Sequence, residues 1–227
     1  MVVGLGLITA VTVLGSGDDA PAFTASATSA AEAGVVEGSA SPSPAASPTK
    51  AAPKAPVYRF PVQGLASYAR THHDYPATDI MAACGNVVVS PVDGVILEVN
   101  RVDSWEPGIN SGETRGGLSW SILGDDGVRY YGSHLSSIET AIKAGVRVTA
   151  GKRLGKIGKT GDTTACHLHF GISPLCRRTG DWWIRRGVIW PSSYLDAWRK
   201  GTPKSPVAAV KAWQTANGCP KKPLTDP

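Results

Sequence analysis

Short apolar runs separated by glycine-, proline- and aspartate-containing turns characterise the chain from residue 58 onward. Short runs rich in β-branched and aromatic side chains, bounded by such turns, are typical of β-strands. The tetrapeptide Gly124-Asp125-Asp126-Gly127 predicts a hairpin turn between two of these runs. Strands are expected over residues 87–89, 94–99, 118–123, 128–131 and 167–172, with two more short strands between residues 146 and 157.

Helical spacing of apolar residues is found only near the C-terminus. Residues 192–198 are long enough for one or two turns, and residues 206–217 place apolar side chains on one helical face. Ser205 is the expected N-cap of the second helix and Pro206 its first residue. Gly218 is expected to end it. We therefore predict an all-β-dominated fold, an antiparallel β-sandwich or barrel-like core with an open groove and a short C-terminal helical segment.

The N-terminal quarter of the chain has a different composition. Residues 1–14 are almost wholly apolar but shorter than the ~20 residues of a membrane-spanning helix, which favours an export signal. No lysine or arginine precedes Lys50, so this signal is expected to be truncated. We assign residues 1–22 to the export segment, 23–57 to a disordered linker rich in alanine, serine, proline and threonine, 58–200 to the main domain and 201–227 to a helical extension and tail. The mature chain is expected to have no membrane span.

Charge narrows the choice of partner. The chain has 227 residues and a net charge of +5. The part from residue 58 onward is more basic, with 21 lysines and arginines against 14 aspartates and glutamates. A basic domain suits nucleic acid, anionic lipid or an anionic cell-wall polymer. The chain shows no aromatic pattern of a known nucleic-acid-binding module, so we expect no nucleic-acid partner. We also expect a monomer.

Four cysteines, none in a C-x-x-C pair, favour two disulfide bonds in an exported protein over a cysteine zinc site. Three pairings are open to Cys84, Cys166, Cys176 and Cys219, and we prefer Cys166–Cys176 with Cys84–Cys219. Five tryptophans in the C-terminal part are expected to pack on the β-core rather than to stack on wall sugars: Trp182, Trp183, Trp190, Trp198 and Trp213.

Five histidines carry the candidate chemistry. In His167-Leu168-His169, residues two apart on a strand point to the same face, so both imidazoles lie side by side. His72, His73 and Asp79 add imidazoles and a carboxylate a short loop apart, which suits a mixed zinc site. His134 follows an expected strand end. Taken singly, each of these residues can also be explained as a solvated strand residue, a surface-loop residue or a turn former.

Together these segments resemble one family, the LytM/lysostaphin-like zinc endopeptidases of peptidoglycan. The similarity covers roughly residues 60–175 and keeps the family's order along the chain. The segments that carry it are DIMAACGNVVVSPVDGVILEV from Asp79, YGSHL from Tyr131, GVRVTAGKRLGKIGKTG from Gly145, and HLHFG from His167.

The resemblance implies a role for each candidate residue. Asp79 and His169 match metal ligands, and His167 matches the general base. His134 matches a second histidine off the metal, which hydrogen-bonds the developing oxyanion or the water. The first histidine ligand stays open: the family spacing of H-x3-D falls on Tyr75, so either His72 or His73 must reach back to the metal. We lean towards His72.

The resemblance therefore implies a secreted, extracellular or wall-associated zinc endopeptidase that cleaves stem peptides or cross-bridges of peptidoglycan. The cofactor is Zn²⁺, and the chemistry is that of zinc-activated water. Two alternatives remain open. One is an inactive wall-binding module that regulates another hydrolase, and the other is a secreted zinc peptidase that acts on proteins.

Overall fold

The computed structural model describes residues 55–223. The expected export segment, residues 1–22, and almost all of the expected linker, residues 23–57, lie outside this range, and both assignments stay predictions. Within the described residues, no helix has the length and apolar character needed to cross a membrane.

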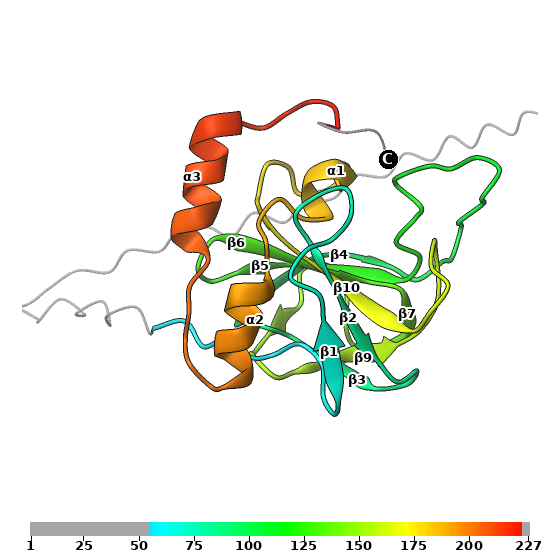
Figure 1. Ribbon diagram of the computed structural model, residues 1–227, viewed down its shortest axis with the longest axis horizontal. Coiled ribbons are helices and arrows are strands. Elements are labelled where there is room, and N and C mark those ends of the chain that lie inside the picture. The colour runs from blue at the N-terminus through cyan, green and yellow to red at the C-terminus, as the bar shows by residue number, and fades with distance from the viewer. Residues whose placement is uncertain (1–54, 224–227) are drawn as a thin grey trace, which may run out of the picture. The chain divides into compact units, whose positions relative to one another are not determined.

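The described chain consists mainly of antiparallel strands in two sheets (Figure 1). The larger sheet has seven strands in the order β1-β2-β10-β6-β5-β4-β8, and the smaller has three in the order β3-β9-β7. The strands are β1 Ala66–Tyr68, β2 Thr78–Ala82, β3 Val87–Val89, β4 Gly94–Asn100, β5 Ser119–Gly124, β6 Val128–Ser133, β7 Leu135–Ile138, β8 Arg147–Val148, β9 Arg153–Ile157 and β10 His167–Pro174. The helices are α1 Trp182–Arg185, α2 Ser192–Arg199 and α3 Val207–Asn217. This architecture confirms the predicted fold class.

Strand β10 lies in the middle of the larger sheet, between β2 and β6. Leu168, Phe170 and Ile172 alternate along β10, so they share one face of the strand, and all three are fully buried in the core. His167 and His169 point to the opposite face, as the period-two pattern predicted. The core thus fixes the orientation of the two histidines. One face of β10 is held by apolar packing, and the other face presents His167 and His169 to the groove.

The hairpin between β5 and β6 confirms the turn predicted at Gly124 to Gly127. Gly127 has a φ of 78°, a left-handed conformation that glycine adopts without a Cβ clash. The predicted helices are also present, and Gly218 ends α3 with a φ of 63°. The start of α3 differs by one residue: Pro206 is the cap, while the Ser205 hydroxyl accepts a hydrogen bond from the Val207 amide.

The preferred disulfide pairing is wrong. The structure pairs Cys84 with Cys166 and Cys176 with Cys219. The reason is the register of β2 against β10, in which Met81 lies opposite His167. Cys84 follows β2 and Cys166 precedes β10, so the two sulfurs meet at the same end of this antiparallel strand pair.

Helix α1 is short and packs directly on the face of β10 that carries the histidines. Its approach requires Gly171, because a Cβ at that position would lie 2.3 Å from the carbonyl oxygen of Arg186. Arg129 of β6 makes a bidentate, fully buried ion pair with Asp181, the residue before the helix, at 2.7 and 3.0 Å. Arg129 also donates to the Ser173 hydroxyl. This pair holds α1 over the sheet, and thus beside the site.

Candidate metal centre and active site

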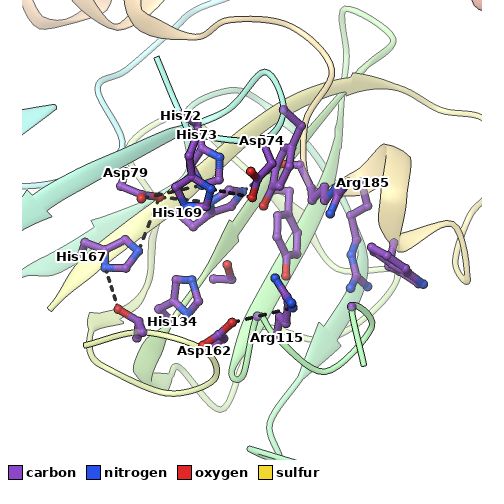
Figure 2. Close-up of a pocket in the computed structure, with 18 of the residues that line it drawn as sticks. His72, His73, Asp74, Asp79, Arg115, His134, Asp162, His167, His169 and Arg185 are labelled. Carbon is purple, nitrogen blue, oxygen red and sulfur yellow. Dashed lines mark hydrogen bonds and ion pairs between the residues drawn. The ribbon is translucent and has the colours of Figure 1, made fainter. Parts of the chain in front are cut away.

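All six predicted site residues line one groove, a cavity of about 420 Å³ on the histidine face of the larger sheet. Figure 2 shows His72, Asp79 and His169 turned towards one another, with His167 and His134 to one side. Asp79 on β2 lies directly opposite His169 on β10 in the strand register, so pairing of the strands alone brings the two side chains together.

Three of these side chains form a cluster suited to a metal ion. His72, Asp79 and His169 each offer one ligand atom, and these atoms lie within 4.8 Å of one another. His169 Nδ1 is 3.1 Å from Asp79 Oδ1, and His72 Nε2 is 3.8 Å from Asp79 Oδ2. Two imidazoles and a carboxylate are a known donor set for zinc when a fourth position stays open.

His169 shows why a cation fits here. Its Nε2 lies 2.8 Å from the carbonyl oxygen of Arg186, which can only accept a hydrogen bond, so Nε2 carries the proton. In the neutral ring, Nδ1 then presents a lone pair to the Asp79 carboxylate, and two acceptors face each other. A proton or a metal ion between them removes this conflict. Backbone contacts of this kind fix the tautomer of metal-binding histidines.

His72 and His73 lie in different surroundings although they are neighbours in sequence. The His72 side chain is 6% exposed and lies within the cluster. Burial and the positive charge of His169 lower the pKa of His72 to about 4, so its imidazole is neutral at pH 7. The His73 side chain is 73% exposed, and its Nδ1 lies 2.6 Å from Asp74 Oδ2. The geometry therefore favours His72 over His73 as the third donor.

The charge state of Asp79 also suits a cation. Burial on its own would raise the pKa of this carboxyl group. A hydrogen bond from Nδ1 of His169 in its protonated form, and the positive charges that the surrounding imidazoles carry when they are protonated, outweigh burial and hold the pKa of Asp79 well below its usual range. Asp79 is thus an anion at every pH at which the protein is expected to work.

His167 and His134 lie beside the cluster, and on each ring only Nδ1 is hydrogen-bonded to a backbone carbonyl. His167 Nδ1 donates to the carbonyl oxygen of Ala165 at 3.0 Å, and its Nε2 lies 3.5 Å from Asp79 Oδ1. His134 Nδ1 donates to the carbonyl oxygen of Thr160 at 2.7 Å. In each neutral ring Nε2 is therefore a proton acceptor.

His134 is unusual both in its backbone conformation and in the pKa of its side chain. Its φ of 67° is left-handed, a conformation that residues other than glycine rarely adopt. Burial and the nearby imidazoles of His169 and His167 lower its pKa to about 3. A neutral His134 can accept a hydrogen bond from water, but it cannot donate one to an oxyanion. The expected hydrogen bond with water suits the neutral ring, and the expected hydrogen bond to an oxyanion requires a proton on Nε2.

Sequence reasoning missed the residues on the other side of the groove. Arg115, from the segment between β4 and β5, and Arg185 and Arg186, at the end of α1, line the same cavity. Tyr131 was quoted only as part of a motif, and Trp182 was expected to pack on the core, but both also line the groove. Their only signal in the sequence is the Trp182-Trp183 and Arg185-Arg186 pairs, which do not by themselves indicate a site.

Comparison with known proteins agrees with the geometry of the site. Residues 73–180 match the model described as peptidase family M23. The groove therefore belongs to a peptidase domain, which includes every candidate site residue except His72. This match confirms the predicted resemblance to LytM/lysostaphin-like endopeptidases. No curated protein matches the chain.

Several solved structures are similar in part. The catalytic domain of the antimicrobial peptidase lysostaphin from Staphylococcus simulans is 24% identical, with 58% of this chain and 92% of that chain covered and a TM-score of 0.45. For a putative glycyl-glycine endopeptidase LytM from Ruminococcus gnavus the identity is 27%, the coverage 51% and 52%, and the TM-score 0.42. A zinc-containing peptidase from Vibrio cholerae is 21% identical, with 51% and 36% covered and a TM-score of 0.39. This chain thus spans about half or less of the last two.

Proposed function

We propose that this domain is a zinc-dependent endopeptidase that cleaves peptide bonds in the stem peptides or cross-bridges of peptidoglycan. The observation that carries the proposal is the convergence of His72, Asp79 and His169 on one point of the groove, beside two imidazoles whose Nδ1 atoms are held by backbone carbonyls. The match of residues 73–180 to peptidase family M23 supports the peptidase activity.

The donor set fits zinc, and His72, Asp79 and His169 would hold it. Zinc bound there supplies Lewis-acid polarisation of a carbonyl group and acidifies water. The remaining chemistry belongs to the chain. His167 Nε2 accepts a proton from the attacking water and returns it to the nitrogen of the leaving amine as the C–N bond breaks. His134 Nε2 accepts a hydrogen bond from the same water and orients it.

The position of these residues suits a polymer substrate. The site lies in an open groove rather than an enclosed cavity, so a peptide that is part of a larger network can enter. The positive charge of the part from residue 58 onward favours approach to an anionic wall. Two disulfides support export to the wall or the extracellular space, because disulfides persist mainly in oxidising compartments.

Digestion of purified sacculi tests the proposal. The full chain with zinc is expected to release soluble peptides and to create new amino termini, while casein in a parallel reaction stays intact. Sedimentation with sacculi without any release would instead indicate a wall-binding module. Cleavage of casein alone would indicate a peptidase that acts on proteins.

A further inference from the structure

His134 is held in place by two neighbouring segments of the chain. The segment between β4 and β5, residues 101–118, lies beside the segment between β9 and β10, residues 158–166 (Figure 1). The first segment fixes the main chain of His134, whose amide donates to the carbonyl oxygen of Gly116 at 2.9 Å. The second segment fixes the ring, since Nδ1 donates to the carbonyl oxygen of Thr160 at 2.7 Å. The orientation of His134 therefore depends on how these two segments are joined.

The two segments approach each other most closely at Gly161. A Cβ at this position would lie 2.1 Å from the carbonyl oxygen of Arg115, and the φ of 75° is left-handed, so the position requires glycine. The amide of Asp162 donates to the same carbonyl oxygen at 2.8 Å. The Thr160 hydroxyl accepts a hydrogen bond from the Leu118 amide at 3.0 Å. These contacts fix the Thr160–Gly161 peptide group in one position between the two segments.

Asp103 binds the other end of this peptide group. Both of its carboxylate oxygens lie 3.1 Å from the Gly161 nitrogen, whose N–H donates to them. Oδ1 also accepts a hydrogen bond from the Trp105 amide at 3.4 Å, which limits the freedom of the carboxylate. The N–H of Gly161 and the carbonyl oxygen of Thr160 belong to one peptide group. The carboxylate of Asp103 and the imidazole of His134 are therefore hydrogen-bonded to the two ends of a single dipole.

Through this arrangement a charge acts on a ring that it does not touch. A carboxylate that accepts from a peptide N–H makes a charge-assisted hydrogen bond, which is stronger than a neutral one. It polarises the peptide group, so the carbonyl oxygen at the other end becomes a better acceptor. The hydrogen bond from His134 Nδ1 is strengthened as a result. A proton held on Nδ1 leaves the lone pair on Nε2, so the tautomer of the ring is fixed as well.

We propose that Asp103 is a positioning residue, whose carboxylate acts through the Thr160–Gly161 peptide group to hold His134 in the tautomer with Nε2 as acceptor. This inference rests on the proposed peptidase function and deepens it. Asp103 keeps Nε2 ready for the hydrogen bond from the attacking water, although it binds the far end of the peptide group and does not meet that water. Loss of its charge should therefore lower kcat and leave KM nearly unchanged.

Nuclear magnetic resonance tests this chain of hydrogen bonds without turnover. Two-bond correlations from the carbon-bound ring protons give the ¹⁵N shifts of both ring nitrogens, and so the tautomer, in the chelator-treated full chain. The His134→Asn protein identifies the signals of His134. Asp103→Asn keeps the size of the side chain and one oxygen acceptor but removes the charge. The Nδ1 and Nε2 shifts of His134 are expected to move towards each other in Asp103→Asn, as the second tautomer becomes populated.

Kinetics of the zinc-loaded full chain on a soluble cross-linked muropeptide give the second readout. In Asp103→Asn, kcat should fall roughly tenfold, the lower end of the range for loss of an outer hydrogen-bond partner in metal sites, at an unchanged melting temperature. Asp125→Asn is the matched control, because Asp125 is an exposed aspartate that pairs with Arg147. It should change neither kcat nor the ¹⁵N shifts of His134. Wild-type shifts in Asp103→Asn would show that Asp103 only ties the two segments together, and would overturn the proposal.

The two readouts separate this inference from the proposed function. Equal kcat in the wild type and Asp103→Asn, with or without a change in the ¹⁵N shifts, would uphold the peptidase and overturn the positioning role. A shifted tautomer in Asp103→Asn, in a protein whose wild type cleaves no wall peptide, would uphold the link between Asp103 and His134 and overturn the peptidase.

Discussion

His72 and His73 offer the sharpest test at the scale of single residues, because two adjacent imidazoles differ in burial and in partners. His72→Ala removes one of three donors. It is expected to weaken zinc binding by more than the roughly 10- to 100-fold that loss of an outer hydrogen-bond partner costs. His73→Ala is the matched control and is expected to leave the affinity nearly unchanged, since this ring pairs with Asp74. Competition with a chromophoric chelator measures both. A larger loss in His73→Ala would reverse the assignment.

His134 predicts a pH dependence of stability in the metal-free protein. Its folded pKa of about 3 lies below the usual value of 6.5, so the unfolded chain binds a proton that the folded chain does not. The free energy of unfolding should therefore fall as the pH is lowered from 6.5 towards 3, by up to about 1.4 kcal/mol per pH unit for this group. His72 adds to this slope, over the range from 6.5 down to about 4.

His134→Asn isolates the contribution of His134 to this slope. Asparagine tolerates the left-handed backbone at this position and does not titrate. Denaturant unfolding at several pH values should show a shallower slope in this variant than in the wild type. An identical slope would show that His134 is not held in its neutral form.

Among the elements of the fold, α1 depends most on one interaction. The buried Arg129–Asp181 pair holds this four-residue helix on the sheet, and the carbonyl oxygen of Arg186 that follows it contacts His169. Asp181→Ala leaves Arg129 buried without its carboxylate and is expected to lower the free energy of unfolding by about 3–5 kcal/mol.

A double variant, Arg129→Met with Asp181→Leu, removes both charges and is the control for this pair. It should be markedly less destabilised than Asp181→Ala, because no charge stays buried without a partner. Denaturant titration measures both proteins. Equal losses in the single and double variants would show that the volume of the side chains, rather than the uncompensated charge, dominates.

The Cys84–Cys166 bond joins the ends of the two strands that carry Asp79, His167 and His169. Replacing both cysteines by serine is expected to lower the free energy of unfolding by about 2–5 kcal/mol and to weaken zinc binding. The Cys176→Ser, Cys219→Ser protein also loses a disulfide, but one that joins the segment after β10 to the segment after α3. It should lose stability while its zinc affinity stays nearly unchanged. Equal losses of affinity in both proteins would contradict the local role of Cys84–Cys166.

The elements that the sequence predicted are those marked by a local pattern of apolar residues and turns. The apolar strands between glycine- and proline-containing turns were expected near their observed positions, and so were the two longer helices. The strand β7, with sequence LSSI, has no alternating pattern and is held by pairing with β9. Helix α1 is too short to be stable alone and exists because of a buried ion pair between distant residues. Neither can be found from local pattern.

Across the whole molecule, some residues of the candidate site could be predicted from the sequence and others could not. Period-two spacing placed His167 and His169 on one face, and the resemblance supplied Asp79 and His134. The choice between His72 and His73 required the path of the loop before β2. The arginines of the groove could not be predicted, because Arg115 and Arg186 come from separate segments and line the same groove only through tertiary packing.

The proposed activity depends on a catalytic zinc held by three side chains. The most direct test is a zinc titration of the chelator-treated full chain, with peptide release from sacculi measured after each addition. Release should rise in proportion to added zinc and level off at about one zinc per chain, the content of a catalytic site with three protein ligands. His169→Ala should stay inactive throughout. Full release before any zinc is added, or the same titration curve in His169→Ala, would contradict the account.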